Sequence, residues 1–185
     1  TRYKVISELK KLGLDVTETP VSPIGIRLSK RLNFLKLNLF KEGFLEVQDE
    51  GSQIVSRLLG AEKGMNVADI CAGGGGKALA MWADMGEEGS ITVSDISQKR
   101  LEKIKPRMKR AGIEKIKMIE SIDKIKGLFD IVLADVPCSG SGAWRRRPEE
   151  GIRLDIAKLI NYKKIQENIL LQASGLLEKG GILAY

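Results

Sequence analysis

Two glycine-containing loops hold most of the residues in this chain that could do chemistry. The first is Asp69-Ile-Cys-Ala-Gly-Gly-Gly-Gly-Lys77, and the second is Asp135-Val-Pro-Cys-Ser-Gly-Ser-Gly142. Each loop follows a short run of apolar, partly β-branched residues. The four glycines carry no Cβ and tolerate the positive φ angles of a tight turn from strand to helix. They predict a cofactor that lies on main-chain amides, beside an active site that contains Cys138.

Two other nucleotide-binding interpretations of the glycine loop can be tested against the sequence. A phosphate-binding P-loop needs a glycine and a Ser or Thr where this chain has Cys71 and Ala78, so it is excluded. A dinucleotide motif in its relaxed form fits residues 73–78. Asp95 follows the next predicted strand and can accept hydrogen bonds from both ribose hydroxyls of either a nicotinamide cofactor or S-adenosylmethionine. The second loop argues against the nicotinamide cofactor, because hydride transfer needs neither the acid Asp135 nor the thiol of Cys138.

The composition excludes several kinds of site. The 185 residues include no histidine and only two cysteines, Cys71 and Cys138, so neither the usual zinc spacings nor a Ser/His/Asp triad can be built. We therefore expect no metal, and proton transfer by Asp, Glu, Lys, Cys or water. We interpret Cys71 as a small packing residue rather than a redox group, and Cys138, beside Asp135 and Pro137, as a chemical one.

Sequence features also bear on location and partners. No apolar run approaches the roughly 18 residues of a membrane span, and the first residues lack the apolar stretch of a signal peptide. The few cysteines argue against a disulfide-stapled secreted domain. We therefore expect a cytoplasmic protein, a monomer, with no membrane contact.

The net charge of +7 favours a polyanionic partner. From Lys99 to Arg110 the chain has seven basic residues and one acid, and the apolar spacing of the segment favours a solvated helix face. The second basic stretch follows the Cys138 loop directly and reads Trp144-Arg145-Arg146-Arg147. Three arginines beside an aromatic ring suit phosphate contact and base stacking. We expect Arg145, Arg146 and Arg147 to bind RNA.

The elements that must position these loops alternate between strands and helices from residue 64 onward, as in a doubly wound parallel sheet. Strands are predicted at 67–70, 91–93, 116–119, 129–134 and 181–185. Helices are predicted at 78–85, 97–111 and 156–177, and Pro106 should kink or break the second. Before this region, residues 2–12 predict a helix, residues 16–28 alternate and turn, and a further helix starts at residues 49–52, where Asp49 or Ser52 can cap it.

From Phe40 to Tyr185 the sequence resembles the Sun/RsmB family of RNA cytosine methyltransferases, which make 5-methylcytosine from S-adenosylmethionine. Three blocks carry the resemblance: Glu46-Val-Gln-Asp-Glu-Gly-Ser52, the glycine loop, and Phe129–Gly142 with the arginines that follow it. The resemblance implies an α/β fold with a doubly wound, mostly parallel Rossmann-like methyltransferase sheet. It also implies that residues 40–185 form the methyltransferase domain and that residues 1–39, an α+β appendage, are a remnant of a small RNA-binding-type subdomain.

The resemblance implies a role for each matching residue. The methionine end of S-adenosylmethionine is assigned to the glycine loop, and the ribose to Asp95. Asp135 is assigned to the edge of the cofactor and the target base, and Glu120 to the adenine, although Asp123 competes for that last role. The loop residues so assigned are Cys71, Ala72, Gly73, Gly74, Gly75, Gly76 and Lys77. The common family loop is Cys-Ala-Ala-Pro-Gly-Gly-Lys-Thr, so the extra glycines here should make the loop more flexible and cofactor binding costlier.

The implied chemistry needs a thiolate, because addition of sulfur to carbon 6 of cytosine activates carbon 5 toward the methyl group. In the family, the cysteine matched by Cys138 assists product release, and a later Thr-Cys-Ser supplies the attacking sulfur. That block is absent here, and we expect the chain to lack pieces at both ends, with its sheet stopping after strand five.

Three function classes follow from these sequence features. The first is an RNA cytosine-C5 methyltransferase acting on rRNA or tRNA, with Asp135 and Cys138 catalytic. The second is a cofactor- and RNA-binding protein without turnover. An amino-group methyltransferase is disfavoured, because Val136-Pro137-Cys138 stands where that class usually has Pro-Pro-aromatic.

Overall fold

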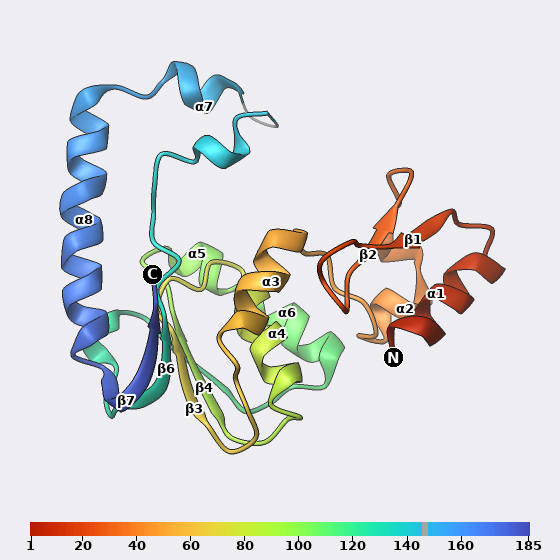
Figure 1. Ribbon diagram of the computed structural model, residues 1–185, viewed down its shortest axis with the longest axis horizontal. Helices are drawn as coiled ribbons and strands as arrows, with labels where there is room; N and C mark the ends of the chain where they lie inside the picture. Colours follow the sequence, from red (N-terminus) through yellow and green to blue (C-terminus); the bar gives the residue numbers. More distant parts are fainter. Residues whose placement is uncertain (146–147) are drawn as a thin grey trace.

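In the computed structural model, which describes residues 1–145 and 148–185, a five-stranded parallel sheet organises the chain from residue 66 onward. Its strand order is β5-β4-β3-β6-β7 (Figure 1). The strands are β3 (Asn66–Asp69), β4 (Ser90–Ser94), β5 (Ile116–Ile119), β6 (Phe129–Leu133) and β7 (Leu177–Ala184). All neighbouring strands in this sheet are parallel. The predicted doubly wound α/β fold is confirmed.

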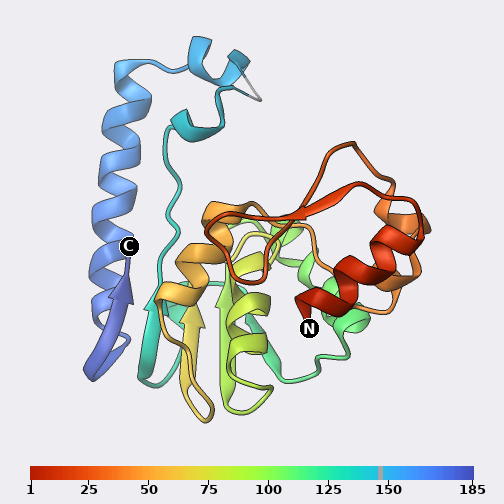
Figure 2. The ribbon, with the colours of Figure 1, turned by 45° about the vertical axis from the view of Figure 1, so that its right-hand side comes forward.

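Two apolar clusters lie on opposite faces of this sheet because side chains alternate along each strand. Val67 of β3 belongs to the cluster under α3 (Glu50–Leu58), α4 (Gly76–Asp84), α5 (Gln98–Leu101) and α6 (Ile104–Ala111). Its neighbour Ala68 belongs to the cluster that packs against α8 (Ile156–Ser174). Figures 1 and 2 show α8 on one side of the sheet and α3 to α6 on the other. The carboxyl ends of the strands remain accessible between these layers.

The predicted break at Pro106 is present, and it lies four residues before the proline. Helix α5 ends at Leu101 and α6 begins at Ile104. Proline has no amide hydrogen to donate to the carbonyl of Glu102, and its ring crowds that carbonyl. The amide of Lys105 instead donates to Glu102 O at 3.3 Å, a bond between residues three apart. The axis of the predicted single helix therefore changes between Leu101 and Ile104.

The first 45 residues build a small unit with its own apolar cluster. It contains α1 (Arg2–Lys11), the antiparallel pair β1 (Val16–Glu18) and β2 (Ile26–Leu28), a 3₁₀ turn (Phe34–Lys36) and α2 (Asn38–Lys41). Leu9, Val16 and Phe40 are buried together, and Leu45 packs against them. The division between residues 39 and 40 stays a prediction, since this cluster spans it.

After β6 the chain leaves the sheet and forms an arm, defined here as residues 135–145 and 148–165. Figures 1 and 2 show it rising beyond the carboxyl ends of the strands before α8 returns. The arm contains a 3₁₀ turn (Ser141–Ala143), α7 (Pro148–Ile152) and the first half of α8. The last helix and strand differ from the sequence prediction: α8 ends at Ser174 and β7 starts at Leu177, with a register shift against β6. The glycines Gly180 and Gly181 lie within this shift, and the strand was predicted to begin only at Gly181.

Across the described ranges 1–145 and 148–185, no helix has the length and apolar character needed to cross a bilayer.

Candidate functional site

A cavity of about 300 Å³ lies at the carboxyl ends of β3 and β6. The order of strands reverses between these two neighbours, and open α/β sheets bind ligands at such a switch point. The cavity brings together most of the predicted loop residues with Asp135. Its lining is Val47, Gln48, Ser52, Asp69, Cys71, Ala72, Gly73, Gly74, Gly76, Lys77, Arg100, Arg107 and Asp135. The sequence analysis assigned no role in the site to Gln48, Asp69, Arg100 or Arg107.

The glycine loop turns the chain from β3 into α4 through two left-handed residues. Gly73 has a φ of 55° and Gly75, the N-cap of α4, has a φ of 76°. A Cβ on Gly75 would lie 2.6 Å from Cγ1 of Ile104, and one on Gly73 would lie 2.9 Å from Nη2 of Arg100. These glycines therefore make room for side chains of α5 and α6. From the sequence we expected the missing Cβ atoms to make room for a ligand, and at Gly73 and Gly75 they make room for protein side chains.

Asp95, one residue beyond β4, holds the glycine loop through a side-chain hydrogen bond. Its Oδ2 accepts the amide of Gly73 at 2.8 Å, and its Oδ1 accepts the amide of Ser97 at 2.8 Å. Arg100 Nη2 lies 3.2 Å from the same Oδ2. The side chain is only 3% exposed and does not line the cavity. Its predicted contact with a ribose stays a prediction.

An ion pair joins the two candidate loops. Nζ of Lys77, on the first turn of α4, lies 2.5 Å from Oδ2 of Asp135, just after β6. The lysine side chain is 18% exposed and the aspartate 59%, so the acid faces the open side of the pair. The two residues lie far apart in sequence, and the parallel pairing of β3 with β6 brings them together. A charge-assisted contact of this kind holds both loops at one edge of the site.

Asp69 is a functional candidate to which the sequence analysis gave no role. It ends β3, is 1% exposed, and its Oδ1 has no hydrogen-bond partner among the residues that the structure describes. Burial raises the pKa of Asp69 to about 7, and the positive charge of Lys77 opposes that rise. An acid at the end of a buried strand, directly before a glycine loop, was the available signal.

The two cysteines lie in different environments. Cys71 is half-buried, packs against the cluster on the α8 face, and its pKa is raised to about 12 by burial. Its thiol is therefore protonated at neutral pH, which agrees with a packing role. Cys138 is exposed on the arm, three residues after Asp135. The carbonyl of Pro137 before it accepts a hydrogen bond from Gln166 Nε2 of α8 at 2.9 Å.

The remaining predicted residues lie outside the cavity. Glu120 is exposed, and its ion pair with Lys124 lowers its pKa. Asp123, its competitor, accepts a hydrogen bond from Gln172 of α8 at 2.6 Å. Gln98 Nε2 donates to the carbonyl of Glu120 at 2.6 Å, so the ends of β4 and β5 are linked near Asp95. The choice between the two acids for the adenine stays open.

Of the three arginines predicted to bind RNA, the structure describes one. Arg145 is exposed on the arm, and Arg146 and Arg147 lie outside the described residues.

The basic segment 99–110 is the predicted solvated helix face at its lysines, which are all exposed, but not at Arg107 and Arg110. The side chains of Arg107 and Arg110 are only 18% and 22% exposed, and both pair with Glu46. Arg107 Nη1 also donates to the carbonyl of Gly74 at 2.5 Å. Helical periodicity placed these arginines on the polar side, but long side chains from that side reach the loop and the segment before α3.

Comparison with known proteins assigns the chain and its fold to a family. Residues 56–185 match the family described as 16S rRNA methyltransferase RsmB/F. The chain belongs to this family. A curated relative, the probable ribosomal RNA small subunit methyltransferase B of Synechocystis sp., is 32% identical over 192 residues, covering 100% of this chain and 43% of the relative. The counterpart in Bacillus subtilis is 29% identical over 191 residues, covering 100% of this chain and 42% of the relative. The chain thus spans less than half the length of these curated relatives.

Solved structures agree with this assignment. The crystal structure of PH0851 is similar with a TM-score of 0.92 and 30% identity, covering 98% of this chain and 42% of that one. A methyltransferase homolog protein from Pyrococcus horikoshii is similar with a TM-score of 0.85 and 25% identity, covering 100% and 60%. The predicted resemblance and the methyltransferase fold are confirmed.

S-adenosylmethionine is the cofactor of this family, and the residues present fit it. Asp69 lines the cavity together with the glycine loop, and its buried Oδ1, which has no hydrogen-bond partner among the described residues, can accept a hydrogen bond from an ammonium group. The same cavity carries charges of both signs, from Asp69 and Asp135 and from Lys77, Arg100 and Arg107. A zwitterionic methionine end with an added sulfonium charge suits such a mixed lining.

We predict that Asp69 makes the stability of the chain depend on pH. Because burial raises the pKa of Asp69 to about 7, the folded chain keeps a proton that the unfolded chain, with a pKa of about 4, releases. The contribution of this residue to the free energy of unfolding is complete below about pH 4 and is lost as pH rises to about 7. Urea unfolding of the wild type and Asp69→Asn across this window measures it. The stability of the wild type relative to Asp69→Asn should fall as pH rises and become constant above about pH 7.

The control is Asp15→Asn, which removes an exposed acid in the turn before β1. Its unfolding free energy should stay parallel to that of the wild type at every pH. Parallel curves for Asp69→Asn as well would show that Asp69 has no raised pKa in the folded chain.

Proposed function

We propose that this chain carries the cofactor site and the cysteine loop of an enzyme that transfers a methyl group from S-adenosylmethionine to carbon 5 of cytosine in RNA. The observation that carries the proposal is the Lys77–Asp135 ion pair of 2.5 Å, which joins the glycine loop to Asp135, the first residue of the loop that carries Cys138. Membership of the RsmB/F family supports an rRNA substrate. The choice of cytosine carbon 5 rests on Asp135, Pro137 and Cys138 in sequence.

The proposed roles follow from the positions of the side chains. Asp69 and the amides of the glycine loop bind the methionine end of the cofactor. Asp135, the more exposed member of its pair, faces the open side and can hydrogen-bond a base, while the ion pair with Lys77 orients its carboxylate. When bound, S-adenosylmethionine would supply an electrophilic methyl group.

Cys138 is the thiol available for a cytosine adduct. It is exposed, whereas the Cys71 thiol is held protonated by a pKa of about 12. Sulfur addition to carbon 6 gives a nucleophilic carbon 5, and after methyl transfer a base removes the proton of carbon 5 so that the sulfur can leave. We propose that Cys138 assists this release step and that a second thiol attacks.

We also propose that residues 1–39 are an RNA-binding-type subdomain and that Arg145, Arg146 and Arg147 bind RNA phosphates. Arg145 supports this by its exposure on the arm that also carries Cys138. With RNA bound to the arm, the target cytosine would lie near Asp135.

A second candidate function is cofactor and RNA binding without turnover. It is favoured by one observation: Cys138 is the one exposed thiol among the two cysteines of the sequence. The resemblance assigns this position to release rather than attack.

We predict that Asp95→Ala weakens S-adenosylmethionine binding by about 1 to 3 kcal/mol, the cost of unpairing polar groups at a binding site. The variant removes the acceptor for the Gly73 amide and the proposed partner of the ribose hydroxyls. Titration calorimetry with the wild type and the variant measures the loss, and Asp15→Asn serves as the exposed control. Equal affinity in wild type and variant would remove Asp95 from the site. NAD binding of comparable strength would contradict the choice of cofactor.

Neutralising Arg145, Arg146 and Arg147 together should flatten the plot of log RNA affinity against log salt by about 2 units. Each phosphate contact on a single strand releases roughly 0.7 of a counterion. The matched control neutralises three exposed lysines just before the amino ends of β3, β5 and β6, namely Lys63, Lys115 and Lys126. A change confined to the arginine variant is the expected result, and equal slopes for both triple variants would mean that the arginines are merely solvated.

We predict that the 185-residue chain binds S-adenosylmethionine but does not methylate cytosine. The test uses RNA that contains 5-fluorocytosine, because fluorine cannot leave as a proton does and the sulfur adduct is trapped. An adduct on Cys138, together with methyl transfer, would contradict the prediction and make Cys138 the nucleophile. Cys138→Ser and Cys71→Ser variants identify the sulfur if any adduct forms.

A further inference from the structure

We propose that Arg107 is a positioning residue for the cofactor loop and that Glu46, from the segment before α3, holds Arg107 in place. The proposal deepens the cofactor-binding role and rests on it. The four glycines leave the loop few side-chain contacts of its own, so its conformation depends on the groups packed against it. Arg107 supplies such a contact from outside the loop.

The first step is the contact between Arg107 and the loop. Nη1 donates to the carbonyl of Gly74 at 2.5 Å, in the middle of the glycine run. A Cβ built on Gly74 would lie 3.4 Å from Nη1, and one on Gly76 would lie 3.5 Å from Nη2. The guanidinium therefore lies along the loop from Gly74 to Gly76. Charge-assisted hydrogen bonds to a carbonyl are stronger than neutral ones.

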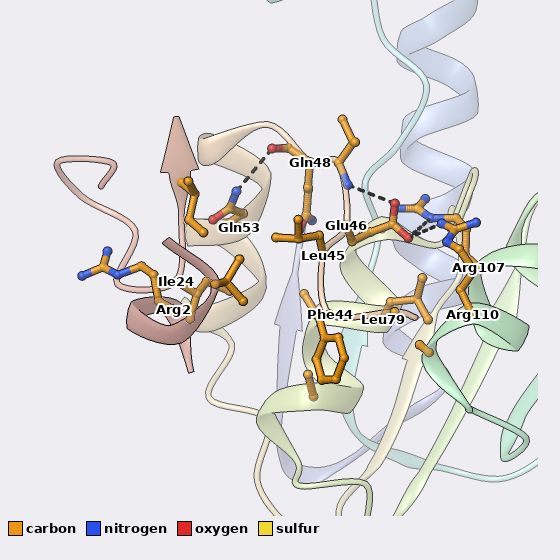
Figure 3. A pocket seen from close by; sticks show the side chains of 18 of the residues that line it. Arg2, Ile24, Phe44, Leu45, Glu46, Gln48, Gln53, Leu79, Arg107 and Arg110 are labelled. Atoms are coloured by element: carbon orange, nitrogen blue, oxygen red, sulfur yellow. Dashed lines mark hydrogen bonds and ion pairs between the residues drawn. The ribbon is translucent and has the colours of Figure 1, made fainter. Parts of the chain in front are cut away.

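The second step is the support of Arg107 itself. Nε of Arg107 lies 3.1 Å from Oε2 of Glu46, which also accepts a hydrogen bond from Arg110 Nη2 at 2.7 Å. The other oxygen, Oε1, accepts the amide of Val47 at 3.0 Å. Figure 3 shows Glu46 pointing toward both arginines from the extended segment that leads to α3. The carboxylate thus fixes the side chains of Arg107 and Arg110, on neighbouring turns of α6.

The third step is the connection of this segment to the first 45 residues. Arg110 lies over the ring of Phe40, with its guanidinium carbon 4.2 Å from the ring centre. On α3, Glu50 accepts the amides of Val21 and Ser22, each at 3.0 Å. Gln53 Oε1 accepts the hydroxyl hydrogen of Ser22 at 2.7 Å. The segment Glu46–Gln53 therefore contacts the N-terminal unit at one end and the helix that holds the cofactor loop at the other.

These contacts form the wall of a second cavity of about 750 Å³, which separates the N-terminal unit from α4 and α6. Figure 3 shows Arg107, Arg110 and Glu46 on one side of it and Arg2, Ile24 and Gln53 on the other. Arg107 and Gln48 line both cavities. Arg107 is thus a side chain through which a shift of the Glu46 segment would reach the glycine loop.

Titration calorimetry with S-adenosylmethionine tests the proposal on the 185-residue chain. We expect Arg107→Gln to weaken binding about tenfold, because the loop must then be ordered at the expense of binding energy. Arg107→Lys keeps the charge, but one ammonium group cannot serve Gly74 and Glu46 as a planar guanidinium does, so it should weaken binding to a similar extent. Lys105→Gln, on the same helix and in an exposed pair with Glu102, is the matched control and should bind as the wild type does.

A double-variant cycle tests whether Glu46 acts through Arg107. Glu46→Gln alone should weaken binding by about threefold, and Glu46→Gln with Arg107→Gln should bind no more weakly than Arg107→Gln alone. Independent effects that multiply would overturn the link between the two residues. Unchanged affinity in Arg107→Gln would overturn the positioning role.

Hydrogen exchange on the cofactor-free chain separates this proposal from the cofactor assignment. In Arg107→Gln, the bonded amides of Ala72, Gly73 and Gly75 should exchange faster, while those of β3 should not change. If the wild type does not bind S-adenosylmethionine, the cofactor site is wrong, but faster exchange confined to the loop still supports Arg107. Unchanged exchange in the loop overturns it.

A rescue variant distinguishes loop order from a direct contact between Arg107 and the cofactor. Gly74 is outside the set of glycines with positive φ, so an alanine is tolerated there once the guanidinium is removed. Arg107→Gln with Gly74→Ala restricts the loop and should recover about two- to fivefold of the lost affinity. No recovery would mean that Arg107 acts by touching the cofactor rather than by positioning Gly74.

Discussion

The buried carboxylate of Asp95 is the interaction on which the cofactor side of the sheet depends. One oxygen holds the amide of Gly73 in the loop after β3, and the other holds the amide of Ser97 at the start of α5, each at 2.8 Å. Because the side chain is only 3% exposed, water cannot readily replace these bonds, and breaking them would leave buried polar groups unpaired. The position of α5, and through it of Arg100 and α6, is therefore tied to the same group that shapes the loop.

The fold could be predicted from the sequence because its signals are local. The runs at β4 and β6 are rich in β-branched residues, as suits parallel strands buried on both faces. Pro106 breaks its helix through a missing amide and a steric clash, both of which are set by the residue type. The end of α8 was harder to predict: Leu176 and Leu177 suit a helix as well as a strand, and the register shift at Gly180 and Gly181 hides the first part of β7.

The candidate site was predicted only in part, because some of its contacts join segments far apart in sequence. Arg107 and Arg110 carried the polar pattern of a solvated face, and contacts with Glu46, Gly74 and Phe40, all distant in sequence, cover them. Lys77 and Asp135 were each identified from their loops, but their ion pair follows from the pairing of β3 with β6. Asp69 belonged to a recognised motif, yet its burial depends on the strands on either side of β3. Sequence patterns identified the residue types of the site and missed the partners that neighbouring elements supply.

The cofactor cavity contains a buried acid, Asp69, which is unfavourable in the absence of a ligand, and a glycine loop, which is costly to order. Leaving the Oδ1 of Asp69 buried without a partner costs free energy, and the raised pKa near 7 reflects that cost. A ligand that donates a hydrogen bond to this oxygen recovers part of the cost, and it also favours the ionised acid. The glycine loop adds a different cost, because binding must reduce its conformational entropy unless protein groups already hold it in place. Asp95 and Arg107 hold the loop at Gly73 and Gly74, whereas Asp69 is left for the ligand to satisfy. Affinity at this site therefore depends on side chains outside the glycine motif as much as on the motif itself.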